Sequence, residues 1–387
     1  MEAYLDNAAT TRVRPEVCEL MQQVLLCDYG NPSSLHSKGM EAEQYLRRAK
    51  QQIADCLRCE PSEIIATSGG TESNNMALIG TALANRRAGN HIIATGIEHA
   101  SVYEPLLFLE SQGWEVTFLP VDAAGRVSVE RLLAEMKEQT VLVSVMAVNN
   151  EIGSVEPIAE IAEKIKSRKP DVLFHVDAIQ AFGKQRLTPG RDGIDLMSAS
   201  GHKIHGPKGS GFLYVRSRTK IKPILYGGGQ EKGMRSGTEN VPAIAGLGLA
   251  AQKMYEELDS NRAHLFRLKR LFTERLQKME QVTINGIPEE GIEATAPHIV
   301  SASFQGVRSE VLLHALEEKG VYCSSGSACS SNHPAISGTL KAIGVRKELL
   351  DSTLRFSFSV ETTEAEVDYA ADCIRQLLPM LRRFLRK

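Results

Sequence analysis

TVLVSVMAVNNEIGSVEPIAEIAEKIKSRKPDVLFHVDAIQA, residues 140–181, contains two apolar runs on either side of an amphipathic segment. The runs at 140–148 and 172–181 are typical of strands that are buried on both faces. The segment between them, at 157–168, is typical of a helix. A strand, a helix and a second strand in this order predict a parallel sheet with helices packed on its faces.

The same alternation continues on both sides of this stretch. Further strands are expected at 63–69, 91–99, 114–121 and 209–217, and helices at 71–88, 101–113 and 128–138. These segments predict an α/β protein with a mostly parallel sheet sandwiched by helices. Such sheets bind ligands outside the carboxyl ends of their strands, so the chemistry is expected in the loops that follow the strands.

The pattern changes after about residue 255. A long, charged helical stretch at 254–279 leads into a second region of strands and helices. We therefore predict a large domain over residues 13–255 and a smaller α+β domain over residues 256–387. The first dozen residues can join either part, and we assign residues 1–12 to the smaller domain.

The bulk composition excludes several classes of protein. The chain has 387 residues, of which 42% are hydrophobic and 24% charged, as in soluble globular proteins. A net charge of -2 favours neither nucleic acid nor membrane binding. Seven scattered cysteines do not resemble a secreted disulfide framework, the N-terminus lacks the pattern of a signal peptide, and the most apolar stretch, 241–251, is too short to span a bilayer. We expect a cytoplasmic protein.

A phosphate site is predicted at SGGTES, residues 68–73, where a strand is followed by a helix. Glycines let backbone N–H groups approach an anion, and a helix N-terminus adds positive charge. Taken alone, the segment is also typical of a plain turn whose polar residues cap the helix.

A lysine follows the apolar segment DLM, residues 195–197, and an aspartate lies within the predicted strand 172–181. Lys203 lies in the tight, polar loop SASGHKIHGPKG, residues 198–209, where a desolvated lysine can form a Schiff base. Asp177 interrupts an apolar strand, where a carboxylate needs a partner. The alternatives are a surface lysine, and an aspartate paired with a nearby arginine or a helix N-terminus. Together with the phosphate site, the two residues indicate pyridoxal phosphate, whose ring nitrogen an aspartate keeps protonated.

The whole set of motifs resembles the NifS/IscS-type cysteine desulfurases, which are class V aminotransferase-like enzymes of pyridoxal phosphate fold type I. The resemblance covers nearly the whole chain. It is carried by YLDNAATT (4–11), GNPSSLHSKG (30–39), TSGGTESNN (67–75), EHASV (98–102), VNNEIG (148–153), HVDAIQ (175–180), SGHKIHGPKG (200–209), GGGQEKGMRSGTENV (227–241), SSGSAC (324–329) and LRFSFS (354–359).

This resemblance implies a cofactor, pyridoxal 5'-phosphate, and the residues that bind it. The implied residues are Gly70, Thr71, His99, Asn150, Asp177, Gln180, Ser200, Gly201, His202, Lys203 and Thr238. Among them, Lys203 matches the lysine that binds the cofactor covalently, and His99 matches the histidine that stacks on its ring. Thr238 matches a phosphate ligand from the second subunit, which implies a homodimer. By themselves, His99 is also typical of a helix cap and Asn150 of a turn.

The resemblance also implies the substrate and the reaction. Arg355, with Asn150, matches the residues that bind the carboxylate of L-cysteine, a task that suits a bidentate guanidinium. Cys329 matches the nucleophile that takes the substrate sulfur as a persulfide and passes it to an acceptor, an iron–sulfur scaffold or a tRNA-thiolation enzyme. Its segment of Ser, Gly and Ala in the smaller domain suits a thiol that must reach both the pocket and the acceptor.

Alternatives remain at the level of function and of single residues. A selenocysteine lyase or an aminotransferase on the same fold, or a non-catalytic sulfur- or metal-binding protein, would share much of the pattern. Cys323 departs from the family pattern and is either a second sulfur-carrying thiol or a buried packing residue. His333 lies four residues after Cys329, but a zinc site needs more ligands than this pair, and CLRC at 56–59 is typical of a structural pair of cysteines. We therefore expect no metal site.

Overall fold

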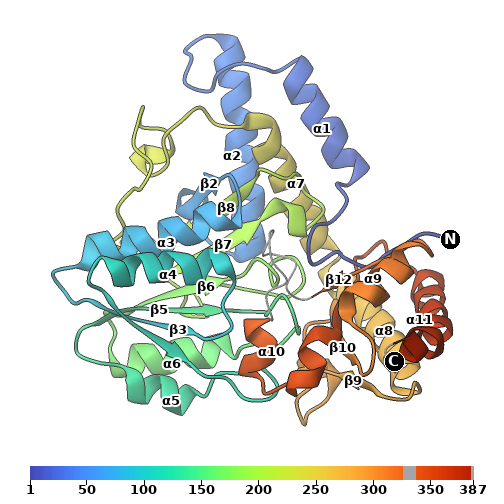
Figure 1. The fold of residues 1–387 in the computed structure, drawn as a ribbon. Coiled ribbons are helices and arrows are strands. Elements are labelled where there is room, and N and C mark those ends of the chain that lie inside the picture. The colour runs from blue at the N-terminus through green and yellow to red at the C-terminus, as the bar shows by residue number, and fades with distance from the viewer. Residues whose placement is uncertain (326–336, 385–387) are drawn as a thin grey trace.

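A seven-stranded sheet dominates the computed structural model, which describes residues 1–325 and 337–384 (Figure 1). The strands lie in the order β2-β8-β7-β6-β5-β3-β4. Their bounds are β2 (Ile64–Thr67), β3 (His91–Thr95), β4 (Glu115–Leu119), β5 (Thr140–Met146), β6 (Leu173–Asp177), β7 (Leu196–Ser200) and β8 (Gly211–Val215). Only β8 runs antiparallel to its neighbours. The expected α/β fold with a mostly parallel sheet is confirmed.

Helices cover both faces of this sheet, with α3 and α4 on one side and α5 and α6 on the other (Figure 1). Alternate residues of a strand point to opposite faces. In β3, Ile92 and Ala94 pack with α3 and α4, whereas Ile93 belongs to the core that contains α5 and α6. Burial on both faces explains why these strands are continuous apolar runs in the sequence.

Helices α3 to α6 lie close to the segments expected, whereas α1, α2 and α7 were not predicted. The helices of this part are α1 (Pro15–Leu26), α2 (Ser37–Leu57), α3 (Gly70–Asn85), α4 (Ala100–Ser111), α5 (Val129–Glu135), α6 (Ile158–Arg168) and α7 (Val241–Glu256). The charged stretch 254–279 is not one helix, because α7 ends at Glu256 and α8 (Leu258–Gln277) begins after a break at Glu257.

A second, antiparallel sheet has the order β12-β13-β10-β9. Its strands are β9 (Val282–Ile284), β10 (Ile299–Phe304), β12 (Ser324–Ser325) and β13 (Thr353–Ser357). It packs with α8, α9 (Ser309–Glu317) and α11 (Glu364–Phe384), and α10 (Gly338–Ala342) lies nearby (Figure 1).

The N-terminal segment connects the two parts. β1 (Ala3–Tyr4) pairs in parallel with β11 (Val321–Tyr322), and Ala3 and Leu5 are buried in the second core. Ala8, only three residues further, is buried in the core of the large sheet. The division at residues 12 and 255 stays a prediction, and this segment lies where the two cores meet.

Within the described ranges, the structure has no helix that is both long enough and apolar enough to span a bilayer.

Candidate active site

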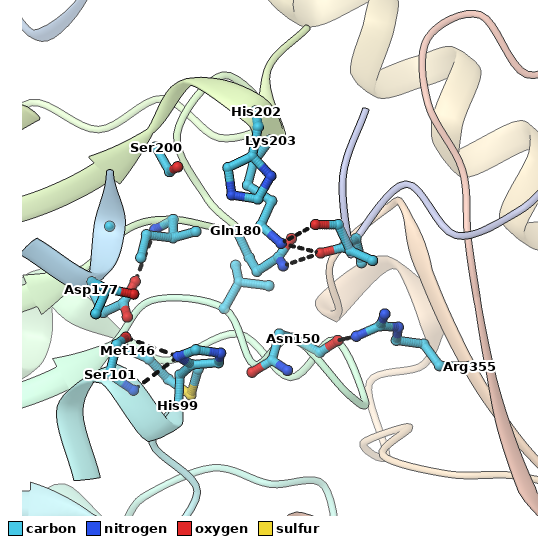
Figure 2. A pocket seen from close by; sticks show the side chains of 16 residues that line it. His99, Ser101, Met146, Asn150, Asp177, Gln180, Ser200, His202, Lys203 and Arg355 are labelled. Atoms are coloured by element: carbon cyan, nitrogen blue, oxygen red, sulfur yellow. Dashed lines mark hydrogen bonds between the residues drawn. The ribbon is translucent and has the colours of Figure 1, made fainter. Parts of the chain in front are cut away.

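A cavity of about 300 Å³ lies at the carboxyl ends of the large sheet's strands, and Arg355 of the second sheet lies on one side of it (Figure 2). It brings together most of the residues that the sequence predicts. Those lining it are Gly70, Thr71, His99, Asn150, Asp177, Gln180, Ser200, His202, Lys203 and Arg355. A cavity of this size suits a small organic ligand or cofactor.

Lys203 is held at the end of β7 by a short 3-10 helix, Gly201–Lys203. Its Nζ donates to the carbonyl oxygens of Ala8, at 2.5 Å, and Ala9, at 2.8 Å. The neighbouring His202 contacts Thr10 Oγ1 through Nδ1 at 3.3 Å. Burial, together with the charge of Lys203, lowers the pKa of His202 to about 4, so this ring is neutral at physiological pH. The N-terminal segment thus orients the lysine inside the cavity.

Asp177 is the last residue of β6 and is 3% exposed. Its Oδ2 accepts from Asn74 Nδ2, and its Oδ1 accepts from the backbone N–H of Ile179, each at 2.9 Å. Burial raises the pKa of its carboxyl group. Among the described residues, no Lys, Arg or His lies within ion-pair distance of it. A buried carboxylate in this position fits a protonated ring nitrogen of a ligand.

The opposite end of the cavity suits a phosphate group. Gly69, at φ +149°, precedes the first turn of α3, in a backbone conformation that side chains disfavour. The first N–H groups of this helix have no acceptor within it, and its dipole attracts an anion. Thr71, Ser200 and His202 line both the cavity and the hollow next to it, which also contains Lys208. The residues present therefore fit pyridoxal phosphate at both ends.

His99 caps a helix and also lines the cavity. It is the N-cap of α4, where its Nδ1 accepts from the backbone N–H of Ser101 at 3.1 Å and lies 2.8 Å from Ser101 Oγ. Its ring also lines the cavity (Figure 2). Since the cap involves Nδ1, it fixes the orientation of the ring that faces the ligand.

Asn150 lines the cavity because its neighbour makes the turn. The Oδ1 atom of Asn149 accepts from the backbone N–H groups of Glu151, at 2.9 Å, and Ile152, at 3.0 Å. Asn149 thus has the turn-forming role that could have belonged to Asn150.

Arg355 reaches the cavity from β13 of the second sheet and is 5% exposed. One terminal nitrogen donates to the carbonyl oxygen of Asn150 and the other to Asp6 Oδ1, both at 2.9 Å. Its Nε is buried and has no hydrogen-bond partner within the described chain. The guanidinium is therefore held firmly, with donor capacity remaining for an anion.

Several predicted residues lie elsewhere. Gly201 does not line the cavity, and a Cβ there would lie 2.4 Å from Ser210 Oγ, so close packing explains this glycine. Thr238 is exposed and borders a separate hollow. Cys323 packs against the second core, and burial raises the pKa of its thiol to about 12. Cys329 and His333 lie outside the described residues.

Some contributors to the site were missed by sequence reasoning. Ala8 and Ala9 act through backbone carbonyls, Asn74 supports Asp177, and Asp6 pairs with Arg355. All four lie inside motifs that carry the family resemblance, which was their only signal in the sequence.

Comparison with known proteins agrees with this geometry. The sequence pattern of the aminotransferase class-V family matches residues 3–370. The cysteine desulfurase IscS of Methanosarcina thermophila is 41% identical over 379 residues, which cover 98% of this chain and 92% of that protein. A solved NifS-like protein is 37% identical, with a TM-score of 0.92 and coverage of 98% of this chain and 100% of that chain. Another solved structure, SspA in complex with cysteine, is 32% identical, with a TM-score of 0.82 and coverage of 93% and 100%.

The similarity thus extends over nearly the whole chain in both sequence and fold. It confirms the resemblance to NifS/IscS-type cysteine desulfurases and the fold type expected from it. The chain belongs to the aminotransferase class-V family.

Proposed function

We propose that this protein is a cysteine desulfurase that converts L-cysteine to L-alanine with pyridoxal 5'-phosphate and keeps the sulfur as a persulfide on Cys329. The observation that carries the proposal is the cavity in which Lys203, the buried carboxylate of Asp177 and the guanidinium of Arg355 meet. Its relatives in sequence support the same reaction.

The cofactor is held by groups from several strands. Asp177 would hold a proton on the ring nitrogen, His99 would contact the ring, and Gln180 would face the phenolic oxygen. The first turn of α3, with Thr71 and Ser200, would hold the phosphate. Bound in this way, pyridoxal phosphate supplies an electron sink for negative charge at the substrate Cα.

The protein's own residues carry out the other steps. Arg355 and Asn150 bind the carboxylate of cysteine, and the amine of Lys203 takes the proton from Cα. The thiolate of Cys329 attacks the substrate sulfur. A sulfur–sulfur bond forms, the bond between Cβ and sulfur breaks, and its electron pair stays on the carbon. A proton then completes alanine, so cysteine and the enzyme thiol become alanine and an enzyme persulfide without another reactant.

The second subunit and the acceptor belong to the same proposal. Thr238 is exposed and lies outside the cavity of its own chain, which supports its assignment as a phosphate ligand for the partner of a homodimer. The persulfide then passes to an iron–sulfur scaffold or a tRNA-thiolation enzyme. A cytoplasmic compartment with reduced thiols suits this exchange.

One assay separates this function from its alternatives. Purified protein is incubated with L-cysteine and a reductant, and alanine and sulfide are quantified. Equal amounts of both are expected. Formation of a keto acid without sulfide would indicate an aminotransferase. Release of selenium from selenocysteine, without release of sulfide from cysteine, would indicate a selenocysteine lyase. A protein that shows neither turnover nor the visible absorbance of the cofactor would be a binding protein.

Two variants separate the cofactor from the nucleophile. Lys203→Ala is expected to lose the visible absorbance of the bound cofactor and all turnover. Cys329→Ser keeps the absorbance and releases no sulfide. Cys27→Ser, which changes an exposed cysteine in another part of the chain, is the control and behaves as wild type. Sulfide release by Cys329→Ser at the wild-type rate would contradict the assignment of the nucleophile.

A further inference from the structure

A second lysine lies directly behind the cavity. Lys184 is 7% exposed, and its Nζ donates to the backbone carbonyl oxygen of Lys203 at 2.9 Å. It belongs to the turn that follows Asp177, where its own N–H donates to the carbonyl oxygen of Ala181. It does not line the cavity, so a ligand there would not touch it.

The surroundings of Lys184 are basic. Its charge helps to lower the pKa of three histidines around it, His202, His205 and His298, and burial is the larger cause in each case. Burial, and then the charge of Lys203, lower the pKa of Lys184 itself to about 7. Within the described ranges, no carboxylate lies within ion-pair distance of its Nζ. Burying an amine without a carboxylate costs free energy, so packing alone does not explain a lysine here.

Lys269 of α8 offers a comparison within the same chain. It is 1% exposed, and burial lowers its pKa to about 7 as well. Its Nζ donates to Thr295 Oγ1 at 2.6 Å and to the carbonyl oxygen of Ala296 at 2.7 Å. Neither acceptor belongs to the cavity wall. Of these two buried lysines, only Lys184 is bonded to the residue that the proposed function places at the centre of the chemistry.

We propose that Lys184 is a positioning residue for Lys203. Its hydrogen bond fixes the Lys203 backbone, so that the side chain stays directed towards the Ala8 and Ala9 carbonyls. When Lys184 is protonated, its positive charge favours the neutral form of the Lys203 amine, which is the form that can accept the Cα proton of the substrate. This inference rests on the proposed function, because it assigns to Lys203 the role of binding the cofactor and moving that proton.

Three variants of the full-length protein, loaded with pyridoxal phosphate, test the inference. Lys184→Met and Lys184→Gln have side chains of equal length, and both remove the charge, but only Gln keeps an N–H donor. Lys269→Met removes an equally buried lysine away from the site. Each protein is titrated with pH while the visible absorbance of the bound cofactor is recorded, and kcat and KM for cysteine are then measured.

We expect the midpoint of the absorbance titration to rise by about one pH unit in both Lys184 variants, because a positive neighbour of the titrating nitrogen is gone. For Lys184→Met, kcat is expected to fall by about tenfold while KM is unchanged. For Lys184→Gln, kcat is expected to fall by less, because Gln keeps an N–H donor. Lys269→Met keeps the wild-type midpoint and kcat, although its melting temperature falls.

A wild-type midpoint in a folded Lys184 variant would overturn the inference, as would a profile equal to that of Lys269→Met. If Lys184→Met does not fold, the midpoint of Lys184→Gln gives the answer. Failure of the proposed function is distinguishable, because the wild-type protein would then release no sulfide from cysteine. Wild-type sulfide release together with an unchanged midpoint contradicts only the role of Lys184.

Discussion

Replacement of Arg355 by alanine tests how the substrate carboxylate is held. The side chain of Arg355 is 6% exposed, so an anion bound to it loses most of its water. Removing one partner of a desolvated charge pair costs about 2–5 kcal/mol. Part of the guanidinium is already occupied, because one terminal nitrogen donates to Asn150 and the other to Asp6. The lower part of that range is therefore expected.

A loss of about 2–3 kcal/mol corresponds to cysteine binding that is about 30- to 150-fold weaker. Arg355→Lys is expected to be nearly as poor, because one ammonium group cannot serve Asn150, Asp6 and the substrate in the geometry of a planar fork. Both changes are made in the Cys329→Ser background, so that cysteine binds without turnover. The dissociation constant is measured from the change in absorbance of the bound cofactor.

Arg275 of α8 provides the matched control. It forms ion pairs with Asp368, at 2.6 Å, and Asp372, at 2.7 Å, but it is 31% exposed and lies outside the cavity. Arg275→Ala is expected to change stability by less than about 1 kcal/mol and to leave cysteine binding unchanged. Wild-type affinity in Arg355→Ala would show that another residue holds the carboxylate and would refute the reasoning.

Two further predictions concern groups that are buried away from the chemistry. Cys323→Ala is expected to keep wild-type sulfide release, because burial raises the pKa of this thiol to about 12 and little thiolate exists at neutral pH. Mass spectrometry of the wild-type protein after incubation with cysteine should find the persulfide on Cys329 alone. A persulfide on Cys323 or a Cys323–Cys329 disulfide would contradict this prediction. Burial raises the pKa of Glu156 to about 8 from 4.5, so its contribution to stability is present below pH 4.5 and is lost as the pH rises to about 8. Glu156→Gln removes this titration, so the melting temperature of the variant should rise relative to that of the wild type between pH 5 and pH 8. A difference between the two melting temperatures that does not change with pH would contradict the raised pKa of this carboxyl group.

All strands of the large sheet except β7 could be predicted from the sequence, because the apolar residues of a buried strand follow one another in the chain. A strand covered by helices on both faces must be apolar along its whole length, as in β5, where all seven residues are buried. Asp177 was found because it interrupts a predicted strand, and Lys203 because it lies in a polar loop after an apolar segment, since ligands bind at the carboxyl edge of such a sheet. The family resemblance then supplied Arg355, His99 and Cys329, the proposed nucleophile.

Only the tertiary structure decided which groups touch. Lys203 Nζ contacts the backbone carbonyl of Ala8, which is 195 residues away in the chain. Every residue type has such a carbonyl, so the amino-acid sequence does not indicate this contact. Asp6 meets Arg355 across the junction of the two cores, 349 residues apart. In the sequence, Lys184 cannot be distinguished from an ordinary lysine near a turn. It is buried behind Lys203 because other segments of the chain pack around it. Local patterns record whether a residue is buried and in which element, because that depends on neighbours along the chain. Contacts between distant segments depend on how whole elements pack, and no local pattern of residues records them.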